Sequence, residues 1–469
     1  MIALFVKVFP YLLLFYFLYR SIKEPIFFLG IPFLMFLGSS IFFEKVSIFS
    51  KFGRMIGIID NSDLLLLAWL IIFWIISRNW HLIRPIRIKN DLFKQSLFNS
   101  MDYIIISLMI ISSIGLIVVY REYENVENVF SDFVTLFSLF LGYFIIKDVI
   151  RRFGYSEIEK FLFAIIIVNS IASILYILHQ GLHFTIYTGE EYATELFQGE
   201  EITRTFWFMP VLCFFSISFL FVFKRTKPII FYPLLSLNIL ALFISYTRSF
   251  LVIVVILIIL YYILDGYKNR NVSKLTKNII IASITGLFFL IMTSNFFPTS
   301  TDYFLSRFTE VKENPTDESS NSIIYRFGKT SEILDKIDND KLLIGFGPVT
   351  EAQLTWVEAM RKTTYDLVWT GVVFRWGYIG LVLFVLLYLI SIVKAFNLFM
   401  KGERELSLLS LLFLLMIISQ LIESFVSSTF LADNRIAMGL WYLAMLSGLI
   451  EISAKNEKLT ELELDNEKL

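Results

Sequence analysis

Long apolar runs recur along this chain, and they constrain its fold more than any other feature. Runs of roughly 17–25 apolar residues are each long enough to cross the ~30 Å hydrocarbon core of a membrane as a helix. A spanning segment must satisfy its backbone hydrogen bonds internally, and the runs lack the alternation typical of β-barrel strands. The sequence therefore predicts an all-α fold, a polytopic transmembrane helical bundle.

We expect about 12–13 spans, the lower number if one early run lies at the membrane interface. The chain would then comprise ten spans (residues 1–297), a large loop (298–369), three further spans (370–452) and a tail (453–469). The candidate spans are Leu4–Leu18, Pro25–Phe43, Leu64–Ile76, Tyr103–Tyr120, Phe133–Ile146, Phe161–Leu178, Thr205–Phe223, Ile229–Ser245, Phe250–Leu264, Ile279–Phe297, Thr370–Val393, Leu406–Glu423 and Ile436–Ile452.

Composition excludes several classes of protein. The chain is 57% hydrophobic, and its 41 basic and 41 acidic residues cancel, which leaves no electrostatic footprint for nucleic acid. The single cysteine, Cys213, excludes a disulfide framework within the chain. The three histidines (His81, His179 and His183) are too scattered to predict a metal site. The first apolar run lacks a small-residue cleavage site, so we interpret it as a retained span.

Short loops alternate between basic and acidic from residue 78 onward, and this alternation predicts the orientation of the spans. The basic stretches, such as Arg78–Lys94 and Lys147–Lys160, are expected in the cytoplasm, as is the tail. The acidic stretches Arg121–Asp132 and His179–Arg204 are then outside, together with Asp302–Asp366. The N-terminal side stays open, because the connection after the second run carries basic residues although counting puts it outside.

The stretch from Asp302 to Gly380 is the only long polar segment, so we expect any chemistry to be assembled there or where it meets the spans. Apolar residues at helical spacing predict one amphipathic helix over Ile323–Ile337. Thr350 and Gln353 form a capping box that predicts a second helix. The loop is therefore expected to be extracytoplasmic and partly helical.

Four arginines are expected near the outer membrane face, and we refer to them below as the four arginines: Arg204, Arg248, Arg307 and Arg326. Arg248 stands between two apolar runs with hardly any loop, which forces it close to the membrane surface. Each of them singly can serve as a helix-end anchor whose side chain reaches the lipid headgroups. Together, their planar donor forks suit a phosphate or diphosphate group carried by a lipid.

Acidic residues at the same face are the candidate bases. Asp366 follows Tyr365 directly before a span, where it is either an acid favoured by the helix dipole or a general base. Glu423 lies at the outer end of its run, as a hydrogen-bonded group between helices or as a second candidate base. Arg375 is about two turns into its run and, if buried, needs an acidic partner such as Glu423 or Asp366. No Asp pair has a metal-binding context, which disfavours a metal-dependent nucleotide-sugar transferase.

From about residue 200 to residue 450, the order of these motifs resembles the bacterial O-antigen ligase and polysaccharide polymerase family. Its members share about a dozen spans and one large extracytoplasmic loop late in the chain. The ligases have a His eleven positions before the first Gly of the turn that precedes the last spans, and this chain has Asp366 there. This departure favours a polymerase. The matching residues are Arg204 with Pro210, Thr247-Arg248-Ser249, Arg307, Arg326, Gly345 with Gly347, and Gly377 with Gly380.

The resemblance implies a metal-independent, glycosyltransferase-type enzyme of the bacterial inner membrane that polymerises lipid-linked oligosaccharide repeat units. The donor would be a glycan on polyprenyl diphosphate within the membrane lipid, and the four arginines would stabilise the departing diphosphate. Arg248 and Arg326 would contribute most to catalysis, and Asp366, or else Glu423, would accept the proton of the acceptor hydroxyl. No cofactor is expected, and a chain-length regulator protein is a candidate partner.

Two alternative functions stay open. The first is a ligase of the same family, which joins finished glycan to lipid A or to protein. The second is a transporter that flips lipid-linked saccharide. Transporters usually have paired halves with polar or broken helices at the midplane, whereas here the polar residues lie at one face and the large loop has no counterpart. This asymmetry favours an enzyme.

Overall fold

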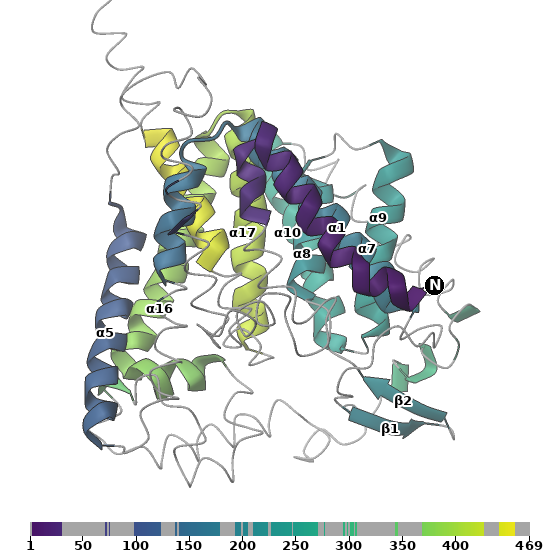
Figure 1. Ribbon diagram of the computed structural model, residues 1–469, viewed down its shortest axis with the longest axis horizontal. Coiled ribbons are helices and arrows are strands. Elements are labelled where there is room, and N and C mark those ends of the chain that lie inside the picture. The colour runs from purple at the N-terminus through teal and green to yellow at the C-terminus, as the bar shows by residue number, and fades with distance from the viewer. Residues whose placement is uncertain are drawn as a thin grey trace, which may run out of the picture. The chain divides into compact units, whose positions relative to one another are not determined.

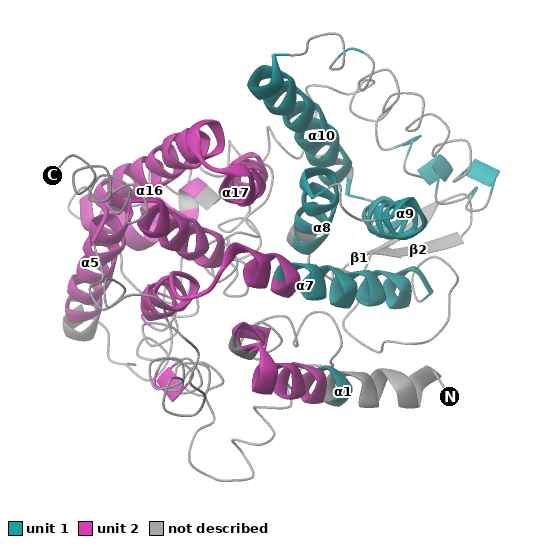
Figure 2. Ribbon diagram, turned by 90° about the horizontal axis from the view of Figure 1, so that it is seen from above, with its two compact units in different colours: residues 1–13, 37–47, 162–325 teal, residues 14–36, 48–161, 326–469 magenta. Residues whose placement is uncertain are grey.

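The computed structural model divides the chain into two compact units (Figure 2). Unit 1 comprises residues 1–13, 37–47 and 162–325, and unit 2 comprises 14–36, 48–161 and 326–469. The structure describes residues 2–30, 71, 72, 75, 98–122, 137, 140–178, 193–197, 200–204, 210–223, 227–245, 247–270, 276, 294, 295, 298, 301–303, 305, 306, 343–345, 368–425 and 440–454.

Most of the described residues are helical (Figure 1). Two of these helices are the helix of residues 140–150 and the helix Leu440–Ala454, which we call the last helix below. The other elements are α1 (Ile2–Lys23), the short 3-10 helix η1 (Pro25–Leu29), α5 (Ser100–Glu122), α7 (Tyr155–Tyr176), β1 (Ala193–Phe197), β2 (Glu200–Arg204), α8 (Pro210–Val222), α9 (Pro228–Ile244), α10 (Arg248–Asn269), α16 (Val368–Lys401) and α17 (Arg404–Ser424).

Five of the described helices are long and apolar enough to cross a membrane, namely those in α5, α7, α10, α16 and α17. Helix α10 shows why the composition is so apolar. Its residues Val252, Val255, Ile259 and Ile263 recur at helical spacing and are exposed, whereas water would favour polar side chains there. The described part thus confirms a helical protein with candidate spans.

The structure differs from the sequence prediction at two places. Residues 193–197 and 200–204 pair as antiparallel strands with Ala193 opposite Arg204, within a stretch that is predicted only as an acidic loop. The span predicted at Thr370–Val393 is not one continuous helix, because Gly377 interrupts α16 with φ 63° and ψ −167°. Strand alternation over five residues and a single glycine in an apolar run are both weak signals.

Other predictions lie outside the described residues. They include most of the second span, most of the spans at Leu64–Ile76 and Ile279–Phe297, both helices of the large loop, and the tail beyond residue 454. Only the start of the second span is described, and it is the 3-10 helix η1, whose first residue Pro25 has no backbone N–H to donate.

In unit 1, a buried polar network joins α7, α8 and α9. The side-chain amide of Asn169 in α7 donates to Asn238 Oδ1 in α9 at 2.7 Å and to Ser216 Oγ in α8 at 3.1 Å. The amide of Asn238 donates in turn to Ser170 Oγ at 3.2 Å. Spanning helices associate through such polar contacts, because lipid removes the hydrophobic driving force between them. Asn169 and Asn238 therefore hold the three helices together.

In unit 2, α16 packs against α17 and α5, and a charged cluster joins α5 to the 140–150 helix. Lys147 forms an ion pair with Asp102, and both side chains are buried. The Asp102 carboxylate also accepts hydrogen bonds from the Tyr143 hydroxyl at 2.9 Å and from the backbone N–H of Asn99 at 2.7 Å. The charge of Asp102 is thus compensated on every side that the structure describes.

The same charged cluster continues to the last helix. Arg151 donates to Glu451 Oε1 at 3.2 Å, and Lys147 Nζ lies 3.8 Å from the other oxygen of that carboxylate. Arg151 also pairs with Asp148. Buried ions are costly unless they are paired and hydrogen-bonded, so this cluster fixes one arrangement of α5, the 140–150 helix and the last helix.

Helix ends that the charge pattern assigns to one membrane face lie together in unit 2. The start of α5, the end of the 140–150 helix and the end of the last helix meet at the charged cluster. The end of α1 lies at the start of α7, since Glu24 is 3.9 Å from Lys160 and the Phe27 and Phe161 ring centroids are 6.0 Å apart. The side of the membrane on which the N-terminus lies stays open.

Candidate functional site

Two predicted diphosphate-binding residues belong to unit 1. Helices α8 and α10 begin close together there, with the ring centroids of Phe214 and Phe250 5.9 Å apart. Arg248 is the first residue of α10. Arg204 is not at a helix start: it is the last residue of β2, six positions before α8 begins at Pro210. Their common role in binding stays a prediction.

The other predicted residues of the large loop lie outside the described residues. These residues are Arg307, Arg326, Tyr365 and Asp366. Their roles stay predictions that follow from the sequence.

Two glycines of the predicted motifs meet backbone to backbone in unit 2. Gly345 has φ 79° and Gly377 has φ 63°, a left-handed conformation that side-chain-bearing residues rarely adopt. A Cβ added to Gly345 would lie 2.6 Å from the backbone of Arg375, and one added to Gly377 would lie 2.3 Å from the carbonyl of Leu343. The 343–345 segment of the large loop is thus docked directly on the interruption of α16.

This docking changes the interpretation of Arg375. The sequence placed it two turns inside a continuous span, but it lies in the helical segment before the interruption at Gly377 and is partly exposed. Arg375 therefore stands where the large loop contacts α16, and its backbone packs against Gly345.

We expect Gly377→Ala to destabilise the protein by about 2–4 kcal/mol, the sum of left-handed strain and overpacking against Leu343. Thermal melting of the purified protein in detergent measures the loss. Gly154→Ala is the matched control, because a Cβ there has no atom within 4 Å among the described residues, and its melting temperature should not change. A Gly377→Ala protein that melts like the wild type would show that the docking does not contribute to stability.

Glu423 is buried at the end of α17, opposite to the charged cluster. Its side chain is 2% exposed. An ionisable residue inside an apolar bundle is costly, which makes it a functional candidate. The structure thus shows Glu423 buried near the end of its helix, and its role as a base stays a prediction.

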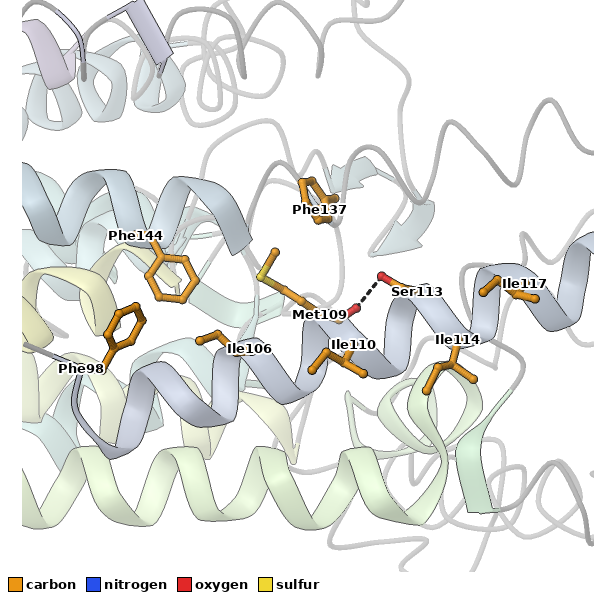
Figure 3. A pocket seen from close by; sticks show the side chains of 9 residues that line it. All are labelled: Phe98, Ile106, Met109, Ile110, Ser113, Ile114, Ile117, Phe137 and Phe144. Carbon is orange, nitrogen blue, oxygen red and sulfur yellow. Dashed lines mark hydrogen bonds between the residues drawn. The ribbon is translucent and has the colours of Figure 1, made fainter. Parts of the chain in front are cut away.

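The described part of unit 2 also has an apolar groove of about 490 Å³ along α5 (Figure 3). Eight of its lining residues are apolar, including Phe98, Ile110 and Phe137. Its one polar residue, Ser113, donates its hydroxyl to the Met109 carbonyl of the same helix at 2.9 Å. The groove therefore offers no group for proton transfer or phosphate binding, and it fits the lipid-facing side of a span.

No protein-family model and no curated protein matches this chain. The likeness to the O-antigen ligase and polysaccharide polymerase family thus depends on the order and spacing of the motifs. Among the described residues, no group of three or more His, Cys, Asp and Glu side chains could hold a metal ion.

Proposed function

We propose that this protein is a polymerase of lipid-linked oligosaccharide repeat units in surface polysaccharide biosynthesis. It transfers the growing glycan from a polyprenyl diphosphate to a sugar hydroxyl of a second lipid-linked unit. The C–O bond to the diphosphate breaks, a new glycosidic bond forms, and the acceptor hydroxyl loses its proton to a base. The lipid diphosphate leaves as an anion that cationic donors must stabilise.

The observation that supports this proposal is that Arg248 begins α10 beside the start of α8, in the unit that also contains Arg204. A guanidinium presents a planar set of donors that matches phosphate oxygens. Two such residues in one helical unit suit a diphosphate held at a membrane face. Arg307 and Arg326 complete the set in our proposal.

The base is Asp366 in this proposal. It occupies the sequence position where the ligases of the resembling family have a His, and a carboxylate can also accept a proton. Glu423 is the alternative base, favoured by its burial. The two acids are distinguishable, because only the residue that accepts the proton is needed for turnover in an otherwise folded protein.

The glycan ladder of a strain that lacks the gene tests the function. A lost polymerase leaves single repeat units on the final acceptor, whereas a lost ligase leaves long chains that are not attached. A lost transporter leaves lipid-linked units on the cytoplasmic side. Complementation with Asp366→Asn should fail and with Glu423→Gln should succeed; the reverse result would assign the proton transfer to Glu423.

A further inference from the structure

The apolar groove of unit 2 runs along the whole candidate span in α5. Its lining residues on α5 recur every three or four positions, so they form one face of the helix. They are Ile106, Met109, Ile110, Ser113, Ile114 and Ile117. Phe98, just before α5, and Phe137 and Phe144 complete the lining (Figure 3). The span from Ser100 to Ile117 is about 25 Å long, and the groove follows it.

One end of the groove is aromatic and borders the charged cluster. The ring centroids of Phe98 and Phe144 are 6.3 Å apart, and Lys147 Nζ lies 5.9 Å from the centroid of the Phe98 ring. The opposite end, at Ile117, is expected at the outer membrane face, because the acidic stretch Arg121–Asp132 follows it. A chain that enters at the outer end thus passes along α5 and reaches the aromatic pair before the ions.

The chemistry and the length of the groove select its ligand. The Ser113 hydroxyl already donates to the Met109 carbonyl, so a saccharide or a phosphate finds no partner in the groove and only hydrocarbon suits it. The acyl chain of a phospholipid extends through one leaflet, which is half of the ~30 Å hydrocarbon core. A single chain that fills a groove about 25 Å long must pass the midplane of the bilayer. A polyprenyl chain is long enough to do so.

We propose that this groove binds the polyprenyl chain of the lipid-linked donor. The proposal rests on the proposed function, since it assigns the lipid part of the same substrate. The diphosphate is held at the outer membrane face, and the chain lies along α5 toward Phe98. A chain that moves from the bilayer into the groove gains only packing, because lipid is as apolar as the groove. The groove therefore contributes a several-fold increase in affinity for the donor.

Photo-crosslinking of the full-length protein in lipid nanodiscs tests the groove. The probe is a polyprenyl diphosphate with a diazirine in its terminal isoprene unit. We expect it to label the start of α5 near Phe98, and an excess of unlabelled polyprenyl diphosphate should remove most of this label. The comparison probe is a phosphatidylglycerol with a diazirine at the end of one acyl chain. It should label α5 no more than it labels α10, whose exposed apolar residues also face lipid.

Ile110→Trp fills the groove from a side chain that is 54% exposed, so the larger ring need not overpack the core. Labelling by the polyprenyl probe should fall about fivefold, and the KM for the lipid-linked donor should rise with kcat unchanged, as expected when uniform binding is lost. Val255→Trp is the matched control, because Val255 is 55% exposed on α10 and does not line the groove. It should be labelled on α5 as the wild type is. Ser113→Phe fills the groove at a second position and tests the site even if Ile110→Trp folds poorly.

Equal labelling of α5 by the two probes would overturn the proposal, because the groove would then be ordinary lipid-exposed surface. Labelling that stays unchanged in both Ile110→Trp and Ser113→Phe would overturn it too. The proposed function fails separately. If the polyprenyl probe labels α5 as expected but the deletion strain still makes full-length polymer, the groove stands as a polyprenyl site and the polymerase assignment does not.

Discussion

Arg248→Ala is expected to abolish long polysaccharide chains while the full-length protein stays in the membrane. A guanidinium that forms two charge-assisted hydrogen bonds to the departing diphosphate contributes about 1.5–3 kcal/mol for each, so the transfer should slow by roughly 10²-fold or more. Arg248 is the first residue of α10, so alanine removes no helical hydrogen bond. A glycan ladder, run beside an immunoblot of the membrane fraction, measures both quantities.

Two further variants sharpen this experiment. Arg248→Lys keeps the charge and loses the planar fork, so it should restore short chains only. Arg270→Ala, at the other end of α10 and exposed, removes the same side chain far from the proposed site and should leave the ladder normal. Full-length polymer from Arg248→Ala would refute the binding of the diphosphate by this arginine.

Asp102→Ala is expected to lower the free energy of unfolding by about 3–5 kcal/mol, because it leaves the Lys147 ammonium buried without its nearest acid. Glu451 replaces Asp102 only in part, since one of its carboxylate oxygens is 3.8 Å from Lys147 and the other accepts from Arg151. The same substitution removes the acceptor for Tyr143 and Asn99. Denaturant or thermal unfolding in detergent, followed by circular dichroism, measures the loss.

The double variant Asp102→Ala with Lys147→Met tests whether the lost stability comes from the unpaired charge of Lys147. Replacing both ions by apolar groups is often neutral, so most of the lost stability should return. Asp265→Ala is the control, because that acid hydrogen-bonds Asn269 at an exposed position of its own helix, and its loss should cost below about 1 kcal/mol. If Asp102→Ala unfolds like the control, the charged cluster does not hold the helices together.

Helices were the most predictable part of this fold. Apolar runs report burial in lipid or protein directly, so the sequence predicts helices where the structure has α5, α9, α10 and α17, with ends a few residues apart. Glu423 was also predicted at the end of its helix between neighbours, because a carboxylate that ends an apolar run has few other places to lie. The charge alternation predicted which helix ends lie together in unit 2.

Pairings between distant residues were not predictable from the sequence. Asp102 is 45 positions from Lys147, and Arg151 is 300 from Glu451, so no local spacing connects them. Gly377 was noticed as part of a turn, but its left-handed backbone depends on the 343–345 segment packed against it.

The sequence by itself determined the class of protein, because long apolar runs with alternating charged loops suit a helical membrane protein and little else. It also placed Arg248 at a helix start, since Arg248 directly precedes an apolar run, whereas Arg204 ends a strand six positions before α8. Only the tertiary structure decided which polar groups are satisfied. Gln420 lacks a partner among the described residues and Asp102 has several, although both stand in similar apolar surroundings, because hydrogen-bond partners come from other helices.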